Sequence, residues 1–456
     1  MKKKKISSVQ LIPLSFLWAI IIGALLLMLP ISSATGQWTN PLVALFTATT
    51  STCVTGLVVV DTYSYFSLFG HIIILLMIQV GGLGIITVIS MVMLITQKKF
   101  SLGDRMMLQD SLNLKTDVGI LKILIRISKD VAKIELTGAA LYAIYFIPEY
   151  GIAKGIWFSI FHSVSAFCNA GIDIIGNNSL MDYKSNPLIM ITTMLLIILG
   201  GLGYVVWFDM SEKIKAGIVK GFTPVQIFKR FTEHTKLVVV VTVTTFLIVS
   251  GAVAFFIAEY NNPGTLGNLS LFDKVINSFF ESITLRTAGF SSIPQENMTD
   301  FSCVISYTLM FIGGSPIGTA GGVKTITIFL ALLNIIAYIH DDDQSIIFNK
   351  RVTDENMRKA TVIVAVATFT IIILTLALIV TNPINIQDGL YEVISASATV
   401  GLSRGLTSSL NSVGQIIIII AMYLGRIGPI SLAIFFAGRS HHKSKCRYVE
   451  GEFFVG

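Results

Sequence analysis

Four short segments of this sequence share one chemistry, because each ends in a glycine whose neighbours can present backbone oxygens to a cation. They are Val54-Thr55-Gly56, Asn169-Ala170-Gly171, Thr287-Ala288-Gly289 and Thr399-Val400-Gly401. The glycines are 115, 118 and 112 residues apart, which is too regular for chance in a chain without low complexity. Carbonyl oxygens can replace the hydration shell of a cation, and glycine tolerates the positive φ that turns a carbonyl toward an axis. The pattern predicts a ring of cation ligands; the alternative is four helix-breaking turns between close-packed helices.

The composition indicates where these segments lie. Of 456 residues, 53% are hydrophobic and only 13% are charged, and the mean hydropathy is +0.77. Soluble domains carry about twice that charged fraction, so a soluble enzyme and a disordered protein are both excluded. Apolar runs close to the ~20 residues that cross a bilayer recur along the chain, and we interpret the first as a retained span rather than a signal peptide. They lie near residues 11–32, 69–96, 131–148, 188–208, 236–258, 303–338, 360–381 and 413–437.

The apolar runs and the tripeptides form one unit that occurs four times: a span, a short weakly apolar segment, a tripeptide and a second span. The short segments are residues 41–52, 155–167, 271–284 and 388–398. Each has the length of a helix that reaches halfway into a membrane, with the negative end of its dipole toward the tripeptide. Non-helical backbone at that depth persists only where it is buried in protein or lines water. We therefore predict an all-α polytopic membrane protein with four span–pore-loop–span repeats around a pseudo-fourfold central pore.

The repeats also predict the division of the chain. Residues 1–103 are the first repeat, 104–210 the second with a preceding cytoplasmic helix, 211–340 the third with a broken span, 341–437 the fourth, and 438–456 a cytoplasmic tail. The second spans share a glycine motif, which we interpret as a common start. The motifs are Gly81-Gly82-Leu83-Gly84, Gly200-Gly201-Leu202-Gly203, Gly313-Gly314 and Gly425-Arg426-Ile427-Gly428.

The charged residues predict an orientation. The N-terminal tail and residues 97–133, 209–236, 337–360 and 438–456 hold 26 of the 33 Lys and Arg residues. Cytoplasmic loops are enriched in Lys and Arg, so both termini are expected in the cytoplasm. The opposite side carries 11 acidic and five basic residues. A negative outer mouth would concentrate cations, whereas ordinary solvated loops are the alternative.

The sixth span cannot continue as one helix. Residues 313–325 contain five glycines and Pro316, and in a helix interior glycine costs about 1 kcal/mol and proline about 3 kcal/mol relative to alanine. A break built of small residues can move, as gates require. A phosphate-binding loop is excluded, because Val323 precedes Lys324 and no strand leads in. The candidate gate residues are Gly313, Gly314, Ser315, Pro316, Gly318, Thr319, Ala320, Gly321, Gly322, Lys324 and Arg426.

Two arginines lie at membrane depth. Arg426 is inside the eighth predicted span, where a buried charge is costly and therefore indicates function. Three roles are considered for the Arg426 side chain: an electrostatic effect on cations, snorkelling to the membrane surface, or a structural hydrogen bond to loop carbonyls. Arg286 is three residues before Gly289, and we expect it to pair with Glu281 or Glu392 behind the tripeptides in a structural role.

The sequence resembles the Trk/Ktr/HKT superfamily of potassium transporters, and more closely the membrane subunit of bacterial Ktr systems. Thr399-Val400-Gly401 is similar to the first half of a potassium-channel filter. The likeness extends to Leu29–Ser32, Leu285–Phe290, Gly425–Pro429 and Arg447–Glu452. It implies that the twelve tripeptide residues form a K+ selectivity filter, that Gly313–Thr325 is the gate, and that Arg426 lies beside that gate as a barrier to cations. Gly56, where HKT members often carry serine, implies a preference for potassium over sodium.

The resemblance also implies partners. It predicts a homodimer, and a cytosolic ring of RCK subunits that binds ATP or ADP and often cyclic di-AMP, because this chain has no sizeable soluble domain. We expect no cofactor in this chain, no metal beyond the transported K+, with Na+ as a candidate activator, contacts with membrane lipids and no nucleic acid. The predicted location is the bacterial cytoplasmic membrane.

Three functions are weighed. Gated potassium uptake is favoured, and Na+- or H+-coupled K+ symport is the alternative. An intramembrane enzyme would need paired catalytic residues at one depth, and the six scattered histidines offer no such arrangement. One glycine per pore loop predicts a shorter filter than that of a tetrameric potassium channel, with weaker K+/Na+ discrimination. Cys53, Cys168, Cys303 and Cys446 fit neither a zinc site nor a redox pair and are expected as free thiols.

Overall fold

Four similar groups of helices account for most of the computed structural model, which describes residues 8–84, 87–88, 90, 93, 120–219, 235–316, 318–341, 345–347 and 350–428. In each group the longest helix comes first and is followed by two shorter ones: a middle helix, called here the short helix, and a last helix, called the second helix. The first two groups are α1 (Ser8–Met28), α2 (Pro41–Cys53) and α4 (Leu68–Leu83), then α7 (Ile120–Tyr150), α8 (Ile152–Phe167) and α9 (Pro187–Gly201). The other two are α12 (Thr235–Glu259), α13 (Leu271–Thr284) and α14 (Asp300–Phe311), then α16 (Asp354–Thr381), α17 (Ile386–Ser397) and α18 (Ser412–Ile427).

Local sequence explains where several of these helices begin. Asn40 and Asn186 accept hydrogen bonds from backbone N–H groups of α2 and α9, and a proline follows each of them at the first helical position. Ser270 caps α13 and Asn411 caps α18 in the same manner. Side-chain caps satisfy N–H groups that have no partner inside a helix, and proline there loses no hydrogen bond.

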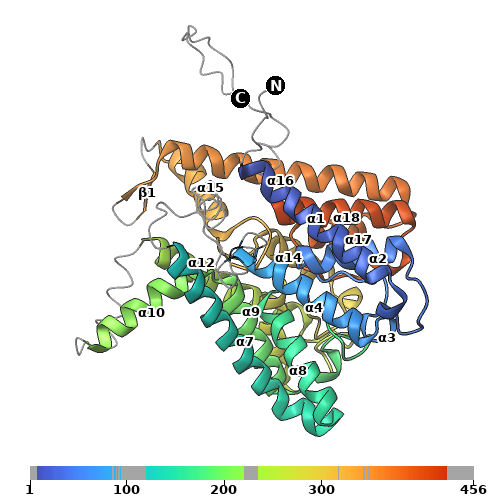
Figure 1. Cartoon of the computed structure of the whole chain (residues 1–456). Helices are drawn as coiled ribbons and strands as arrows, with labels where there is room; N and C mark the ends of the chain where they lie inside the picture. Colours follow the sequence, from blue (N-terminus) through green and yellow to red (C-terminus); the bar gives the residue numbers. More distant parts are fainter. Residues whose placement is uncertain are drawn as a thin grey trace, which may run out of the picture.

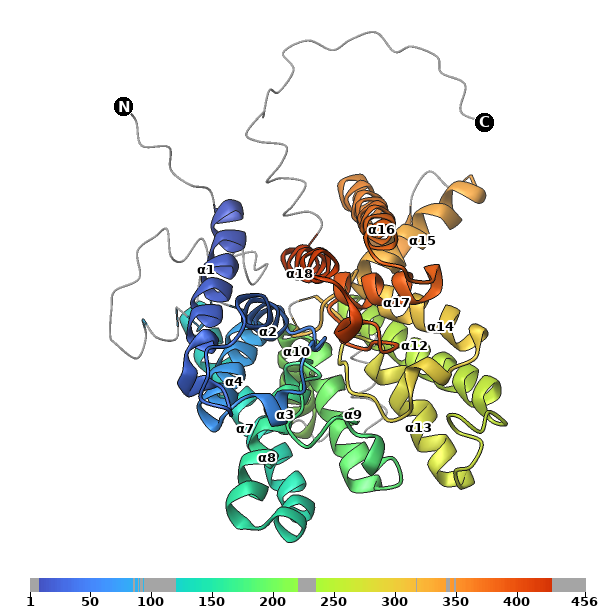
Figure 2. The same cartoon turned by 90° about the vertical axis from the view of Figure 1, so that its right-hand side faces the viewer.

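The groups contact one another in a closed order. The last helix of each group packs against the middle, short helix of the next group. Thus α4 contacts α8, α9 contacts α13, α14 contacts α17, and α18 contacts α2. Figure 2 shows the groups in this order, from blue through teal and yellow to red. A fully buried aromatic side chain anchors every short helix: Phe46, Phe161, Phe280 and Tyr391. The core therefore lies around the short helices rather than around the long ones.

The shared glycine motif marks the end of the second helices, not their start, so that interpretation was wrong. Gly84, Gly203 and Gly428 each follow the last turn of a second helix with φ of +86°, +87° and +86°. Glycine adopts this backbone without the clash that a Cβ would cause. In the third repeat the fourth motif position is Pro316, whose ring fixes φ near −65°. The chain there cannot make the same one-residue turn and instead forms a loop between α14 and α15 (Thr325–Ile339).

The helix bounds correct several predicted spans and confirm the break in another. The span expected at 413–437 does not run straight through, because α18 stops at Ile427. The spans expected at 69–96 and 188–208 do not run straight through, because α4 stops at Leu83 and α9 is followed, after a bend of 103°, by α10 (Tyr204–Val219). The span expected at 131–148 begins earlier, since α7 starts at Ile120. The predicted break in the 303–338 span is confirmed between Phe311 and Thr325.

By length and composition, three helices in the described part of the chain can cross a membrane by themselves: Lys122–Tyr150, Val238–Glu259 and Asp354–Thr381. The bent pair Pro187–Gly201 and Val206–Glu212 counts as a fourth candidate. Shorter apolar helices occur at Pro13–Met28, Leu68–Leu83, Asp300–Phe311, Thr325–Ile339 and Ser412–Ile427.

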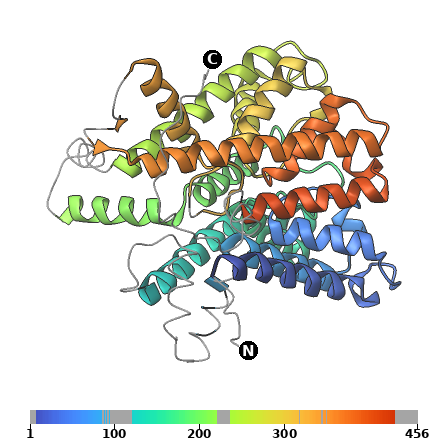
Figure 3. The same ribbon diagram turned by 90° about the horizontal axis from the view of Figure 1, so that it is seen from above.

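The remaining elements are small. Helix α3 (Thr62–Tyr65) and the 3-10 turns η1 (Pro30–Ser32), η2 (Met181–Tyr183), η3 (Gln295–Asn297) and η4 (Thr407–Ser409) lie in connections. Strands β1 (Ile346–Ile347) and β2 (Lys350–Arg351) form an antiparallel hairpin, with Ile346 opposite Arg351. Both α10 and the hairpin lie on one side of the molecule, where α10 leads away from the helix bundle (Figures 1 and 3). Of the predicted helix at 104–126, only 120–126 fall within the described residues, as part of α7; the tail 438–456 and Ile317 lie outside them.

Candidate functional site

The four tripeptides share one backbone conformation. Their first residues, Val54, Asn169, Thr287 and Thr399, have φ of 57°, 59°, 73° and 53°. Their glycines, Gly56, Gly171, Gly289 and Gly401, have φ of 100°, 62°, 84° and 100°. The positive φ predicted for the glycines is confirmed, whereas the left-handed first residues were not predicted. β-branched side chains rarely adopt this region, so the surrounding structure must hold these loops in a costly conformation.

The structure brings the four glycines together in a ring. A Cβ atom added to Gly56 would lie within 3.0 Å of the Ala170 carbonyl oxygen of the next loop. The same collision joins Gly171 to Ala288, Gly289 to Val400, and Gly401 back to Thr55. Each glycine thus faces the middle carbonyl of the following tripeptide, in the order of the helix groups. Any side chain at these positions would displace a backbone carbonyl, which explains why all four loops carry glycine.

A hydroxyl group near the end of each short helix supports each loop. The Gly56 N–H donates to Thr50 Oγ1 (2.9 Å), and the Gly401 N–H donates to Ser395 Oγ (3.1 Å). In the other two loops the hydroxyl is the donor: Ser165 Oγ to the Ile172 carbonyl and Thr284 Oγ1 to the Phe290 carbonyl, both at 2.6 Å. The sequence analysis missed these residues, although a serine or threonine five or six positions before every glycine was the available signal.

The short helices point their C-terminal ends at the tripeptides. Helix α2 ends at Cys53, α8 at Phe167, α13 at Thr284 and α17 at Ser397, one to three residues before the respective tripeptide. A helix C-terminus carries roughly half a negative elementary charge, which favours a cation nearby. Four such ends and a ring of carbonyls together form a surrounding suited to a desolvated monovalent cation.

A cavity of about 520 Å³ adjoins the ring on one side and is lined by residues of all four loops, including the four glycines. Among the described residues, its lining contains the acids Asp61, Asp173 and Glu296 and no lysine or arginine. The Asn177 side-chain amide has its nitrogen toward Asp61, and this nitrogen donates to both carboxylate oxygens of Asp61, at 3.1 and 2.9 Å. Burial, and then the nearby Asp61 carboxylate, raise the pKa of Asp173 to about 7, against the opposing effect of hydrogen bonds from Ile175 and Ser179. The cavity therefore has the acidic lining expected of a mouth that attracts cations.

On the other side of the ring lies the segment 313–325, which we call the gate loop. Its base is closed by hydrogen bonds from the Gly313 N–H to the Val323 carbonyl (3.0 Å) and from the Val323 N–H to the Phe311 carbonyl (3.1 Å). Its tip binds the end of α9, because the Ser315 and Thr319 N–H groups donate to the Gly201 and Gly200 carbonyls at 2.9 and 3.1 Å.

The gate loop also touches three of the four tripeptides. Thr319 Oγ1 lies 3.3 Å from Asn169 Oδ1, and the Gly321 N–H donates to Thr287 Oγ1 (3.2 Å). A Cβ added to Gly321 would lie within 3.0 Å of Thr399 Oγ1. The loop therefore lies against the ring, on the side away from the acidic cavity.

Three basic side chains bind the gate loop. Arg426 donates to the Thr319 carbonyl (2.7 Å) and to the Gly81 carbonyl of α4, so the hydrogen bonds to carbonyls considered for it are present. Lys324 Nζ donates to the Ala320 carbonyl (2.6 Å). The buried Arg286 donates to the Gly313 carbonyl (3.2 Å).

The predicted pairing of Arg286 with Glu281 or Glu392 is therefore wrong. The buried Glu281 accepts from Ser292 and Gln295, and the buried Glu392 accepts from Ser403 and Thr407. Each carboxylate thus ties its short helix to the segment after its own tripeptide. Arg404 adds a further tie, since its guanidinium binds Asp388 (2.8 Å) and the Gln295 carbonyl (2.8 Å). These groups brace the loops from outside and do not belong to the ring itself.

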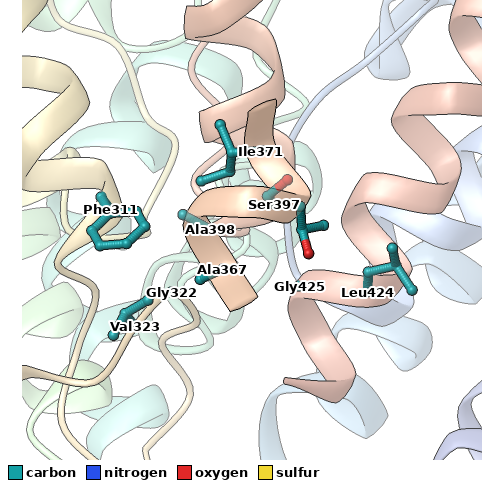
Figure 4. A pocket seen from close by; sticks show the side chains of 10 residues that line it. Phe311, Gly322, Val323, Ala367, Ile371, Ser397, Ala398, Leu424 and Gly425 are labelled. Atoms are coloured by element: carbon teal, nitrogen blue, oxygen red, sulfur yellow. The ribbon is translucent and has the colours of Figure 1, made fainter. Parts of the chain in front are cut away.

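A second, much smaller cavity of about 40 Å³ lies beside the gate loop. Figure 4 shows its wall, with Phe311 and Val323 on one side and Leu424 on the other, and with Ile371 of α16 between them. Gly322, with φ of +66°, also lines it. The point at which the gate loop rejoins the helical chain thus borders empty apolar space.

Elsewhere the described residues offer little chemistry. They contain no group of three or more His, Cys, Asp or Glu side chains placed to hold a metal ion. Cys53, Cys168 and Cys303 are buried free thiols, as predicted, while Cys446 lies outside the described residues. His340 caps the C-terminal end of α15. Three aspartates follow it in the sequence, and Asp342 and Asp343 lie outside the described residues.

Comparison with known proteins identifies the family. Residues 9–444 match the TrkH family, described as cation transport protein. The chain belongs to the TrkH family. It is 38% identical over 451 residues to the Ktr system potassium uptake protein B of Bacillus subtilis, covering 98% of this chain and 96% of that protein. It is 37% identical to the potassium/sodium uptake protein NtpJ of Enterococcus hirae, covering 94% and 93%.

A solved structure has the same fold. The potassium transporter TrkH from Vibrio parahaemolyticus matches with a TM-score of 0.73 over 95% of this chain and 86% of that chain, at 16% identity. The resemblance inferred from the sequence is thus confirmed. This TrkH-family chain is a multi-pass membrane protein of a family of cation transporters, and its relatives are transporters rather than enzymes.

Proposed function

We propose that this chain is the pore-forming subunit of a potassium uptake system, with four repeats placed around one pseudo-fourfold central pore. The observation that carries the proposal is the ring of four glycines, which separates an acidic cavity from a gate loop held by arginines. The closed order of helix contacts supports the symmetry. The names of two relatives, a potassium uptake protein and a potassium/sodium uptake protein, support potassium as the transported ion.

The proposed selectivity filter consists of the twelve tripeptide residues. Their carbonyl oxygens replace water around K+, and the four helix C-termini stabilise its charge. One glycine per loop makes the filter shorter than that of a tetrameric potassium channel, so we expect weaker K+/Na+ discrimination. Glycine at position 56 favours K+ over Na+ in this arrangement.

The proposed gate is the loop from Gly313 to Lys324 together with Arg426. The loop closes the inner end of the filter through its bonds to α9 and to the tripeptides. Arg426 adds a positive charge at that point, which raises the energy of a cation. Opening requires that the loop and the guanidinium move apart from the filter.

The membrane orientation follows from charge. The β1–β2 hairpin and α10 lie on one side of the molecule, which the positive-inside rule assigns to the cytoplasm, and we propose that both termini lie there, with the chain in the bacterial cytoplasmic membrane. We propose repeat boundaries at residues 103, 210, 340 and 437, the second of which lies within α10. Contacts with membrane lipids cover the exposed apolar faces.

Regulation is proposed to come from outside the chain. The Ktr system name of a 38% identical relative is consistent with a further subunit, which we propose to be a cytosolic ring of RCK domains that binds ATP, ADP or cyclic di-AMP. We propose a homodimer of this chain, and Na+ as an activator. Symport of K+ with Na+ or H+ is the alternative mechanism; K+ accumulation beyond the membrane potential would favour it.

The test is uptake of K+ or Rb+ at limiting K+ in cells that lack other potassium uptake, with wild type and Gly401→Ser compared. A Cβ at Gly401 would collide with the Thr55 carbonyl, so we expect uptake by the wild type and a loss of K+/Na+ discrimination of about tenfold in the variant. Gly405→Ser is the matched control, because its Cβ would meet nothing within 4 Å. Absence of uptake by the wild type with a co-expressed RCK subunit would overturn the function, and unchanged selectivity of Gly401→Ser would overturn the filter.

A further inference from the structure

Asn169 differs from the equivalent residues of the other three tripeptides. Repeats one, three and four carry Val54, Thr287 and Thr399 there, whereas the second carries an amide. All four residues are almost completely buried and have left-handed backbones. Asn169 therefore places the longest polar side chain of the four at the inner end of the glycine ring.

In this structure the gate loop is hydrogen-bonded to the Asn169 side chain. The hydroxyl of Thr319 lies 3.1 Å from the Phe167 carbonyl and 3.3 Å from Asn169 Oδ1, so its one proton is shared between two acceptors of the second pore loop. The Thr319 carbonyl is held by Arg426 and its N–H by Gly200. Every polar group of Thr319 is thus used to bind another repeat.

Polar groups around this point remain without partners among the described residues. Asn169 Nδ2 and Thr399 Oγ1 are buried and make no hydrogen bond there. Buried polar groups are nearly always satisfied by protein or water, and an oxygen can also be satisfied by a cation. The two unpaired groups beside the proposed permeation path therefore indicate a place where water enters and where the Thr399 oxygen can meet a cation. The cavity beside Gly322 and Val323 leaves room for the loop to shift.

The geometry points to Asn169 as a state-dependent ion ligand: its amide oxygen is bonded to Thr319 when the gate loop is closed and is released to face a cation at the inner end of the filter when the loop withdraws. This inference deepens the proposed function and rests on it. An amide oxygen is a suitable ligand for a hard monovalent cation, as a backbone carbonyl is. Gate position and ion selectivity are then coupled through one hydrogen bond.

The coupling is tested with Thr319→Val, which removes the hydroxyl and keeps the shape. Its matched control is Thr375→Val, because the buried Thr375 hydroxyl on α16, outside the filter and the gate loop, has no hydrogen-bond partner among the described residues. We expect Thr319→Val to raise Rb+ uptake without a regulatory subunit by about fivefold, the effect of losing one neutral hydrogen bond, and Thr375→Val to leave it unchanged. In a double-mutant cycle Asn169→Leu should add nothing to Thr319→Val. Full additivity would overturn the coupling.

The ligand role is tested by selectivity in the Thr319→Val background. Asn169→Leu removes the oxygen and should lower the Rb+/Na+ uptake ratio about threefold or more by raising Na+ uptake, whereas Asn169→Asp keeps an oxygen in place and should preserve most of the ratio. An equal loss of ratio in both variants, or no loss in either, would overturn the ligand role. Wild-type uptake with the RCK subunit is measured alongside: its absence would contradict the proposed function, while its presence with unchanged ratios contradicts only this inference.

Discussion

The two sides of the glycine ring, which we propose to be its outer and inner sides, carry opposite charge and are built differently. On the outer side, an open cavity is lined by Asp61, Asp173 and Glu296, with no basic residue among the described ones. On the inner side, Arg286, Lys324 and Arg426 hold a folded loop through its carbonyl oxygens. None of these three bases forms an ion pair with a described carboxylate. Carbonyl dipoles orient a positive charge without cancelling it, so in the proposed pore the inner side opposes the cations that the outer side attracts.

This difference suggests a division of work within the proposed pore. The outer side uses fixed charge and water, which act over distance and need no movement. The inner side uses hydrogen bonds to one loop, which can be broken together. The ring between them has a rigid, repeated backbone in which each glycine touches the next loop. Selection and closure are therefore assigned to neighbouring but separate parts.

The largest expected effect comes from removing the inner side altogether. Replacing Ser315–Lys324 by Leu-Gly would give the third repeat the same motif as the first, Gly-Gly-Leu-Gly. We expect uptake without a regulatory subunit to rise about tenfold or more, because the closing loop is gone. Rb+ uptake by the variant, at equal amounts in the membrane, is the measurement. Loss of all flux in a correctly inserted protein would contradict the gate.

Arg426 should have the next largest effect. Arg426→Gln removes the charge and the bond to the Thr319 carbonyl, so uptake without the regulatory subunit should rise about fivefold. Arg426→Lys keeps the charge but loses the paired hydrogen bonds to the Thr319 and Gly81 carbonyls. Uptake without the regulatory subunit should therefore rise less than in Arg426→Gln. Equal uptake in both variants would mean that hydrogen bonding alone, rather than charge, closes the inner side.

Arg286 separates loop anchoring from ion contact. Arg286→Met removes the bond to the Gly313 carbonyl at the base of the loop and should raise basal Rb+ uptake about threefold. The Rb+/Na+ uptake ratio should not change, because the guanidinium does not touch the glycine ring. A changed ratio would show that this arginine acts on the filter rather than on the loop.

The smallest effect is expected on the outer side, where Asp173 has a pKa raised to about 7. A raised carboxyl pKa keeps the group neutral below that pH and charged above it, so the negative charge of the cavity grows as external pH rises from 6 to 8. Uptake at limiting K+ should increase about twofold over this range. In Asp173→Asn the pH profile should be flat, and an unchanged profile would assign the titration to another group.

Sequence reasoning located the tripeptides and the broken helix correctly, because both depend on local backbone physics. Glycine at a fixed interval predicts positive φ, and glycines with Pro316 predict a helix break. It misjudged the glycine motifs, because the same residues are compatible with either end of a helix in an apolar run. It also missed the left-handed Val54, Thr287 and Thr399, since β-branched residues are normally read as extended.

The partner of Arg286 shows a different limit. Arg286 was expected to pair with Glu281, five residues before it, or with Glu392 of the fourth repeat, but both carboxylates are satisfied by hydroxyl and amide groups of their own loops. Spacing in the sequence does not determine which face of a short helix points inward. The same holds for Thr319 and Asn169, which are 150 residues apart and yet in contact.

By itself, the sequence determined the membrane class, the fourfold repeat, the glycine loops and the place where the sixth span breaks. These follow from composition, spacing and the conformational limits of glycine and proline, which act within a few residues. Only the tertiary structure decided that each glycine faces the next loop's carbonyl, that the gate loop binds three tripeptides, and that the outer acids and inner bases face opposite sides of one ring. The physical reason is that these contacts join residues far apart in the sequence, from 34 positions for Gly321 and Thr287 to more than one hundred between the tripeptides, and packing of four helix groups, rather than local preference, sets which of them meet.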